Sequence, residues 1–220
     1  KAGLVEKYFC LSMENTTALE DIELGDDGLR VGDKHVSVHT LSELDALPGK
    51  VGTDCRYERL STDKSDCKLS FASPVGLLLS CNHLYNQYIF LDDSGENLQR
   101  FEKNARNMQS LSKYSRSNQI NKEWIDLYLN DAHSFGLTSV RAHCNIIAWT
   151  DNPMEVKNMR NDVGSQIAMM ECKPRHNTVD AATLYWAAIP GNGADFPAEE
   201  SFYTFIEQAL CFWVEETNYR

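Results

Sequence analysis

The sequence lacks any long apolar run. Its longest apolar stretches, residues 75–79 and 184–189, are far shorter than the ~20 residues that a membrane-spanning helix requires. It also lacks the charged, apolar and small-residue regions of a secretory signal, and it begins at Lys1 rather than at a methionine. We therefore expect no membrane anchor among these residues, and we expect the chain to be an internal part of a longer protein.

The sequence also lacks the motifs of common catalytic and metal sites. Residues 49–53 (GKVGT) have the letters of a phosphate loop but not the order G-x-x-x-x-G-K-[ST]. The lone pair Cys81 and His83 cannot supply four zinc ligands. No nucleophile, base and oxyanion-stabilising set can be assembled from the sequence. We therefore expect no catalytic residue, no cofactor-binding residue and no metal ligand in this chain.

Charge and cysteine usage narrow the class of protein further. The net charge of −11 disfavours a general nucleic-acid platform, because phosphate binding needs clustered lysine and arginine. The cysteines are odd in number and scattered, which predicts reduced, mostly buried thiols of a cytosolic protein. They are Cys10, Cys55, Cys67, Cys81, Cys144, Cys172 and Cys211.

The first part of the chain has the composition of β-strands. Residues 4–13 are rich in aromatic and β-favouring side chains, and residues 29–40 predict a hairpin around Gly32 and Asp33. His35 and His39 then belong to an exposed strand face and are not a helical zinc pair, because the local period is two. Residues 60–68 are polar and predict a mobile loop, the best boundary inside the chain.

Residues 69–79 and 85–91 predict two more strands, after which the apolar period becomes helical. Asp93 and Glu96 have capping-box spacing before a helix that runs to about Tyr114. A solvated helix face is the ordinary interpretation of its polar side, but that side could also meet phosphates, an acidic lipid surface or an acidic partner. Its basic residues, with two beyond the helix, are Arg100, Lys103, Arg106, Lys113, Arg116 and Lys122.

A second helix should begin at Asn121 and end at Gly136. We expect it to be buried, because Trp124, Tyr128 and Phe135 make it strongly apolar. Residues 137–149 alternate as a strand. Neighbours in a strand point to opposite faces, so His143 and Cys144 do not form a catalytic pair.

The last third of the sequence predicts helices and one tight turn, which we call the corner. Asn152 and Pro153 start a helix that we expect to fill the core. Residues 180–188 form an apolar element that leads into the corner Ile189, Pro190, Gly191 and Asn192, where proline fixes φ and glycine can take a positive φ. After Pro197 a final amphipathic helix is expected over residues 202–213.

Together these elements predict an α+β fold, a mostly antiparallel sheet with helices packed on one face. The expected organisation is a β-rich part over residues 1–68, an α+β core over 69–190, and over 191–220 a corner and helix that lead to an absent ATPase domain.

Several segments resemble one protein family. WAAIPGN (residues 186–192) and DFPAEESF (195–202) resemble the segment upstream of the P-loop in TraG-family conjugation ATPases, the TrbE/CagE-type motors of type IV secretion. Residues 73–83 (SPVGLLLSCNH), 132–139 (AHSFGLTS) and 170–177 (MECKPRHN) look like the TraG proteins of conjugative transposons. The resemblance covers nearly the whole chain.

The resemblance implies a non-catalytic assembly and docking domain of a conjugative DNA-transfer ATPase. The expected partners are inner-membrane subunits of the secretion channel and neighbouring motor subunits, with self-association in a motor oligomer. The expected location is cytoplasmic, peripheral to the inner membrane. ATP and Mg²⁺ would belong to the absent motor domain, since no Walker A sequence is present here and none of the family's ATPase residues can be carried over. The alternative is a nucleic-acid-binding module that uses the basic residues between 100 and 122.

Overall fold

The computed structural model describes residues 3–12, 20–25, 28–112 and 114–216. It has an α+β fold built on a mostly antiparallel sheet, which confirms the predicted fold class. The described strands are β1 (Ile22–Gly25), β2 (Gly28–Val31), β3 (Lys34–Leu41), β4 (Asp54–Arg56), β5 (Lys68–Ser70), β6 (Asn82–Phe90), β7 (Ser139–Thr150), β8 (Arg175–Asn177) and β9 (Phe202–Phe205). The described helices are α1 (Leu4–Phe9), α2 (Ser94–Leu111), α3 (Arg116–Phe135), α4 (Val156–Met169), α5 (Ala181–Ala188) and α6 (Ile206–Leu210).

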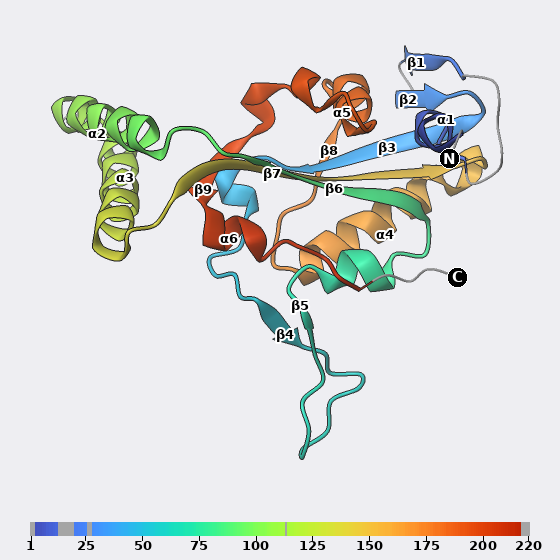
Figure 1. Cartoon of the computed structure of the whole chain (residues 1–220), viewed down its shortest axis with the longest axis horizontal. Coiled ribbons are helices and arrows are strands. Elements are labelled where there is room, and N and C mark those ends of the chain that lie inside the picture. The colour runs from blue at the N-terminus through green and yellow to red at the C-terminus, as the bar shows by residue number, and fades with distance from the viewer. Residues whose placement is uncertain (1–2, 13–19, 26–27, 113, 217–220) are drawn as a thin grey trace. The chain divides into compact units, whose positions relative to one another are not determined.

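The main sheet has the strand order β1-β2-β3-β7-β6, with β8 paired to β3 and β9 paired to β7 (Figure 1). β2 and β3 form the predicted hairpin, in which Val31 pairs with Lys34. The long strands β3 and β7 are antiparallel, with His39 opposite Ile146 and Thr40 opposite Asn145. This register decides which side chains share a face of the sheet.

The chain divides into two compact units that are made of interleaved segments. The sheet unit contains Lys1–Tyr88, His143–Phe202 and Cys211–Arg220, and the hairpin unit contains Ile89–Ala142 and Tyr203–Leu210. The predicted divisions at residues 68 and 190 stay predictions.

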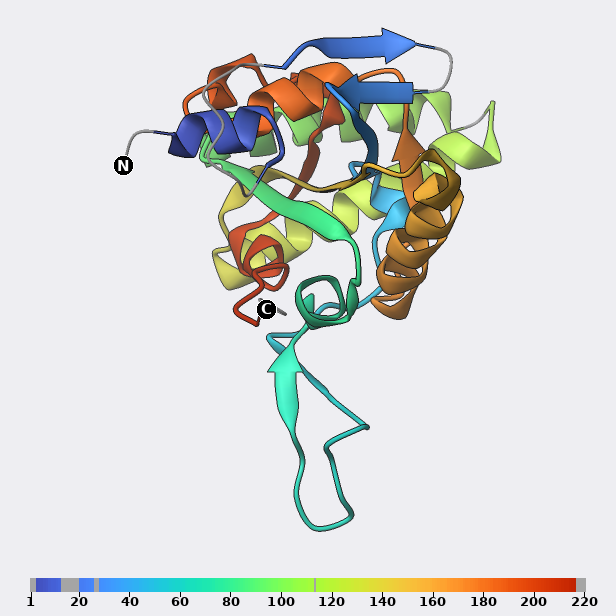
Figure 2. The same cartoon turned by 90° about the vertical axis from the view of Figure 1, so that its right-hand side faces the viewer.

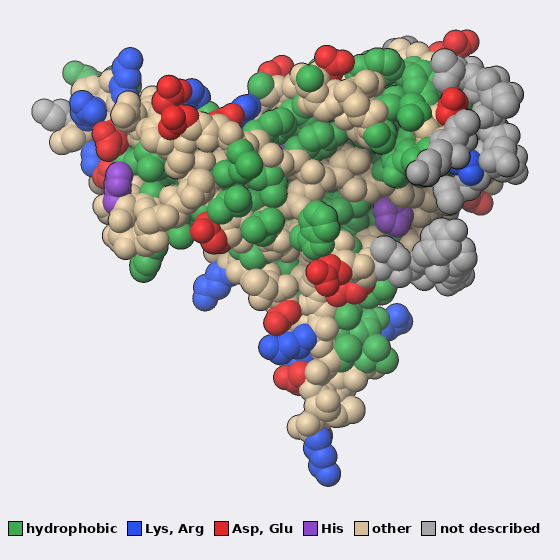
Figure 3. All heavy atoms as spheres, viewed as in Figure 1, with side chains coloured by type: hydrophobic (Ala, Val, Ile, Leu, Met, Phe, Trp, Pro, Cys, Tyr) green, Lys and Arg blue, Asp and Glu red, His purple; other side chains and the backbone are tan. Residues whose placement is uncertain are grey.

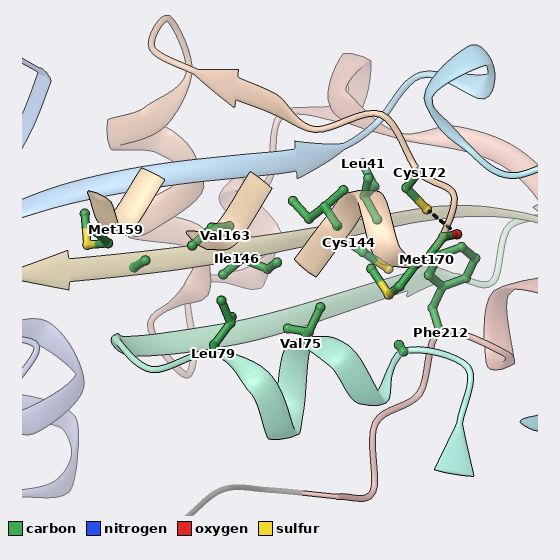
Figure 4. Packing of buried hydrophobic residues seen from close by; sticks show 13 residues of the cluster. Leu41, Val75, Leu79, Cys144, Ile146, Met159, Val163, Met170, Cys172 and Phe212 are labelled. Atoms are coloured by element: carbon green, nitrogen blue, oxygen red, sulfur yellow. Dashed lines mark hydrogen bonds between the residues drawn. The ribbon is translucent and has the colours of Figure 1, made fainter. Parts of the chain in front are cut away.

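The core of the sheet unit lies between α4, a π-helical segment (Pro74–Leu78) and one face of the sheet. Alternate residues of β7, Cys144 and Ile146, point into this core because strand side chains alternate between faces. Val163 and Ile167 of α4 are completely buried against them. Figure 4 shows these side chains gathered between the ribbons.

The opposite face of the sheet unit is covered by α5, which contacts β3 and β1 (Figures 1 and 2). Leu184 and Tyr185 of α5 are buried at 0% and 1% exposure. The Tyr185 hydroxyl donates to the backbone carbonyl of Phe9, just at the end of α1. Helices therefore lie over both faces of the sheet, so the expectation that they pack on one face was wrong.

The segment after α6 is held closely against the base of the β4–β5 ribbon. The backbone amide of Ser70 donates to Glu216 Oε1 at 2.8 Å, and the Tyr85 hydroxyl donates to the carbonyl of Phe212 at 2.8 Å. A Cβ atom built on Gly76 would lie 2.2 Å from the backbone oxygen of Glu216, so only glycine allows this approach. Beyond its base the ribbon extends away from the sheet, as Figures 1 and 2 both show.

Four sequence-based expectations about elements were wrong. Residues 4–9 form helix α1 instead of a strand. Within 69–79 the strand ends at Ser70 and a π-helical segment begins at Pro74. The predicted final helix is strand β9 followed by the short α6. α3 begins five residues before Asn121, with Ser115 as its cap.

His39 was predicted to lie on an exposed face, and this was also wrong. It is 4% exposed, because α4 covers the face of β3 that carries it. Ser37 Oγ lies 3.1 Å from His39 Nε2. Burial, with smaller contributions from His176 and Arg160, lowers the pKa of His39 to about 4.

None of the helices in the described part of the chain combines the length and the apolar character that crossing a bilayer would require.

Candidate functional site

The hairpin unit is organised around the antiparallel helices α2 and α3, and local signals place their ends. The Asp93 carboxylate accepts from the amide of Glu96 at 3.1 Å, as predicted, and starts α2. Ser115 Oγ accepts from the amide of Ser117 at 3.2 Å and starts α3. Gly136 ends α3 at φ 63°, a conformation that costs glycine little. Short polar side chains therefore fix the beginnings of both helices.

The inner face of the hairpin packs on an aromatic cluster. The Tyr128 ring of α3 stacks on Phe205 with centroids 4.4 Å apart, and it lies 5.0 Å from the Phe101 ring of α2. The Tyr128 hydroxyl donates to the carbonyl of Thr204 at 3.2 Å, and its oxygen lies 2.9 Å from Ser139 Oγ, whose hydroxyl can donate to it. Its polar end is thus satisfied, and the inner face of α3 has its partners within the unit.

The other side of α3 also carries large apolar side chains, and these face solvent. We call this set the α3 outer face: Ile120, Trp124, Leu127 and Phe135, which are 44%, 69%, 60% and 73% exposed. The first three follow at intervals of four and three residues, so they form one stripe along the helix. A helix that is apolar on two faces has more apolar surface than its own unit buries.

Charged and polar groups lie at both ends of the α3 outer face. Arg116 and Asp131 are exposed, and each is four residues beyond an apolar member of the stripe, Ile120 or Leu127. A hollow of about 530 Å³ lies at the end of the stripe nearest the α2–α3 turn. It is lined by Ser112, Tyr114, Ser115, Arg116, Gln119, Ile120 and Glu123.

The predicted basic residues do not gather on one face. Arg100, Lys103 and Arg106 lie on α2, whereas Arg116 and Lys122 lie on α3, roughly 120° apart around its axis. Lys113 lies outside the described residues. On the surface of the hairpin, at the left of Figure 3, blue basic side chains alternate with red acidic ones.

Three of these basic side chains already have partners. Arg100 donates to the Tyr203 hydroxyl at 2.6 Å. Arg106 pairs with Glu102 at 3.6 Å, and Lys122 pairs with Asp126 at 2.5 Å. Lys103 and Arg116 are exposed, with no ion pair among the described residues. The surface thus offers few free positive charges to a phosphate backbone.

The corner at residues 189–192 adopts the tight turn that its sequence predicts. Asn192 N donates to Ile189 O at 3.0 Å, and Gly191 has φ 108°. Pro190 and Gly191 are the residues that a type II turn favours at its two central positions. Ile189 is buried at 4% exposure and ties the turn to the sheet unit, whereas Pro190 and Gly191 are exposed.

A chain of hydrogen bonds holds the segment after the corner on the sheet. Asn86 Nδ2 donates to Asn145 Oδ1 at 2.9 Å, and Asn145 Nδ2 lies 3.0 Å from His143 Nε2. An amide nitrogen can only donate, so His143 Nε2 accepts. His143 Nδ1 therefore carries the proton and donates to the carbonyl of Glu200 at 2.7 Å. The chain of donors fixes one neutral tautomer.

Burial keeps this histidine uncharged. His143 has 0% exposure, and burial lowers its pKa to about 4. Cys144, the adjacent residue of β7, points into the core on the other face, and burial raises its pKa to about 12. The prediction that His143 and Cys144 do not meet is confirmed.

Glu200 adds a buried carboxylate to the same face. Its Oε1 accepts from Asn177 Nδ2 at 3.1 Å and lies 3.7 Å from Arg175 Nη2. Arg175 also donates to Glu43 at 2.8 Å, so one guanidinium joins two carboxylates. Glu200 Oε2 is buried and has no hydrogen-bond partner among the described residues. These contacts fasten the segment after the corner to β8 and to the loop after β3.

Burial lowers the reactivity of several thiols of the chain. All seven cysteines are free. Only Cys10, Cys144 and Cys172 are buried, so the expectation of mostly buried thiols was wrong. Burial raises the pKa of Cys81 and of Cys172 to about 11, which disfavours the reactive thiolate. Within the described ranges, no group of three or more His, Cys, Asp or Glu residues is placed to hold a metal ion.

No model of a known protein family matches the chain. No curated protein matches it either.

Sequence reasoning missed the α3 outer face, because it assigned Trp124 and Phe135 to a buried stripe. The signal was present: apolar residues occur at positions 120, 124 and 127 as well as at 125, 128, 129 and 132. These two sets lie on different sides of a helix with 3.6 residues per turn. One set packs inside the unit, and the other is exposed to solvent.

Proposed function

We propose that this chain is a protein-interaction module rather than a catalyst. The observation that carries the proposal is the α3 outer face, where Trp124 and Leu127 are exposed although α3 already packs on its inner side. Exposed aromatic and aliphatic side chains grouped on one surface are typical of sites that bind other proteins.

More particularly, we propose that it is the assembly and docking domain of a TraG-family conjugative DNA-transfer ATPase. The resemblance of residues 186–202 to the segment upstream of that family's P-loop supports this assignment. The anchored turn at Ile189–Asn192 gives the resembling residues a structural role. In this proposal the sheet unit is the rigid base, and the hairpin unit presents the docking surface to inner-membrane channel subunits or to neighbouring motor subunits.

A transfer-inhibition assay tests the proposal. The chain is produced in donor cells that carry the parent conjugative element, and the frequency of DNA transfer is measured. A docking domain without its motor should occupy docking sites and lower transfer by mass action. Unchanged transfer in cells that contain abundant folded chain would contradict the proposal.

A matched variant shows whether the docking surface is responsible. Trp124→Glu with Leu127→Glu should restore transfer, because a charge at the centre of an apolar interface is costly. Lys103→Glu on α2 alters charge outside the stripe and should still inhibit transfer. Fluorescence anisotropy with single-stranded DNA tests the alternative: salt-sensitive binding that is lost in Lys103→Gln with Arg116→Gln would favour a nucleic-acid-binding module.

A further inference from the structure

The α3 outer face has a pattern that is complementary to itself. Ile120 and Leu127 lie at equal distances on either side of a point between Glu123 and Trp124. Four residues further out, Arg116 stands at one end and Asp131 at the other. The stripe therefore has three apolar residues with a cation at one end and an anion at the other.

Such a stripe matches a second copy of the same helix placed antiparallel to it. In a two-fold interface, when one residue of the first copy contacts a different residue of the second copy, the same two residues also meet with the copies exchanged. With the axis midway between Ile120 and Leu127, Ile120 meets the other copy's Leu127, and Arg116 meets the other copy's Asp131. Both charges are exposed in the single chain and lie at the rim, where opposite charges favour one register.

The hollow beside the α2–α3 turn has a suitable occupant in the same arrangement. In an antiparallel pair, the end of one α3 lies beside the beginning of the other. Phe135 is at the end of α3 and is 73% exposed. The hollow of about 530 Å³, lined by Ser115 and Arg116, is at the beginning. An aromatic ring that enters a pocket at an interface is a common anchor.

We propose that two copies of this chain associate through their α3 outer faces, antiparallel about a two-fold axis, with Phe135 of each copy entering the hollow of the other. The proposal deepens the proposed docking function, on which it rests, by naming the partner of this surface. An α3 pair of 20 residues is about 30 Å long. It buries less surface than a standard interface of ~800 Å² per partner. The association is therefore reversible and concentration-dependent.

Charge exchange provides the decisive test. Sedimentation velocity over a range of concentrations should show that the natural chain passes from monomer to dimer. Arg116→Asp and Asp131→Arg should each weaken the dimer at least about tenfold, because two-fold symmetry places each like-charge contact twice in the interface. Combining the two substitutions should restore the dimer, since the opposite charges face each other again.

Controls separate this surface from a general effect of charge or folding. Lys103→Asp, a charge reversal on the exposed side of α2, should leave the dimer unchanged. Trp124 is the only tryptophan of the hairpin unit, so in a chain whose other tryptophans are replaced by phenylalanine its emission should shift to the blue with concentration. Circular dichroism verifies that each variant keeps its helix content.

Three results would overturn the inference: a natural chain that stays monomeric, single variants that dimerise as the natural chain does, or a double variant that stays monomeric. Inhibition of DNA transfer by a monomeric chain would leave the docking function standing. A natural chain that neither forms a dimer nor inhibits DNA transfer would overturn both proposals.

Discussion

Helices α4 and α3 have similar apolar patterns in the sequence but opposite surroundings in the structure. In α4, Val163 and Ile167 are completely buried in the core of the sheet unit. In α3, Trp124 and Leu127 are 69% and 60% exposed. The comparison teaches that helical periodicity marks a face that packs, without saying whether the packing partner belongs to the same chain.

The polar groups of the two units differ in burial, as the apolar groups of α4 and α3 do. In the sheet unit, His39 and His143 are buried and are kept neutral by burial. In the hairpin unit, a pair at the surface such as Lys122–Asp126 is partly exposed and contributes little to stability. The polar groups named in the sheet unit are therefore shielded from water, whereas those in the hairpin unit face solvent.

The largest contrast should come from the same substitution in the two helices. Ile167→Ala leaves a cavity beneath the sheet, because Ile167 is 0% exposed, and should lower the free energy of unfolding by about 2–5 kcal/mol. Ile120→Ala on the α3 outer face should lower it by less than ~1 kcal/mol. Urea unfolding at dilute concentration, followed by circular dichroism, compares the two. Equal losses would contradict the difference in burial.

The next effect concerns Gly76 in the sheet unit. A Cβ at this position would lie 2.2 Å from Glu216 O and 2.5 Å from Val214 Cγ1, so the segment over residues 212–216 must move. Gly76→Ala should cost about 3 kcal/mol, and hydrogen exchange over residues 211–216 should become faster.

Gly164 provides the matched control for Gly76. A Cβ there would meet Pro174 at 3.8 Å, an ordinary contact, within α4. Gly164→Ala should therefore stabilise the chain by about 0.5–1 kcal/mol, because alanine loses less backbone entropy in a helix. Similar destabilisation by both substitutions would show that residues 212–216 do not press on Gly76.

The next effect is a dependence of stability on pH that belongs to the sheet unit. The pKa of His143 is lowered to about 4, whereas an unfolded histidine titrates near 6.5. The unfolded state therefore binds more protons between these values, and the stability present above pH ~6.5 is lost as the pH falls toward 4. Between pH 7 and 5 this loss is about 2 kcal/mol for His143.

His143→Gln should remove that contribution, so its free energy of unfolding should fall less between pH 7 and pH 5 than that of the natural chain. His39, also at a pKa of about 4, keeps its own contribution in this variant. His133→Gln in the hairpin unit serves as the control, because this side chain is 62% exposed, and it should change stability by less than ~0.5 kcal/mol. An unchanged pH dependence in His143→Gln would contradict the buried neutral state.

Local signals allowed several elements to be predicted. Asn152 accepts from the amide of Met154 at 3.1 Å before α4, as its position ahead of a proline predicts. Gly136 and Asp93 end and begin helices for equally local reasons. The alternation of β7 was readable because apolar residues of one face alternate with polar residues such as His143 and Asn145 on the other. In each case the determining contacts lie within a few residues of each other.

Residues 4–9 and 74–78 could not be placed in this way. Leu4–Phe9 has strand-like composition but forms α1, whose end is bonded to Tyr185 far along the chain. The π-helical segment Pro74–Leu78 packs against α4 and against residues 214–216. Contacts of this kind join distant positions, and they override the weak preferences of short segments.

The sequence by itself determined where helices and strands begin and end when a cap, a proline or a glycine fixes the backbone, and it determined that α3 is apolar on more than one side. Only the tertiary structure decided which side of α3 meets solvent, that His39 lies beneath α4, and that the predicted basic residues do not share a face. The physical reason is that a cap or a turn is a local interaction, whereas exposure depends on which distant segments cover a surface.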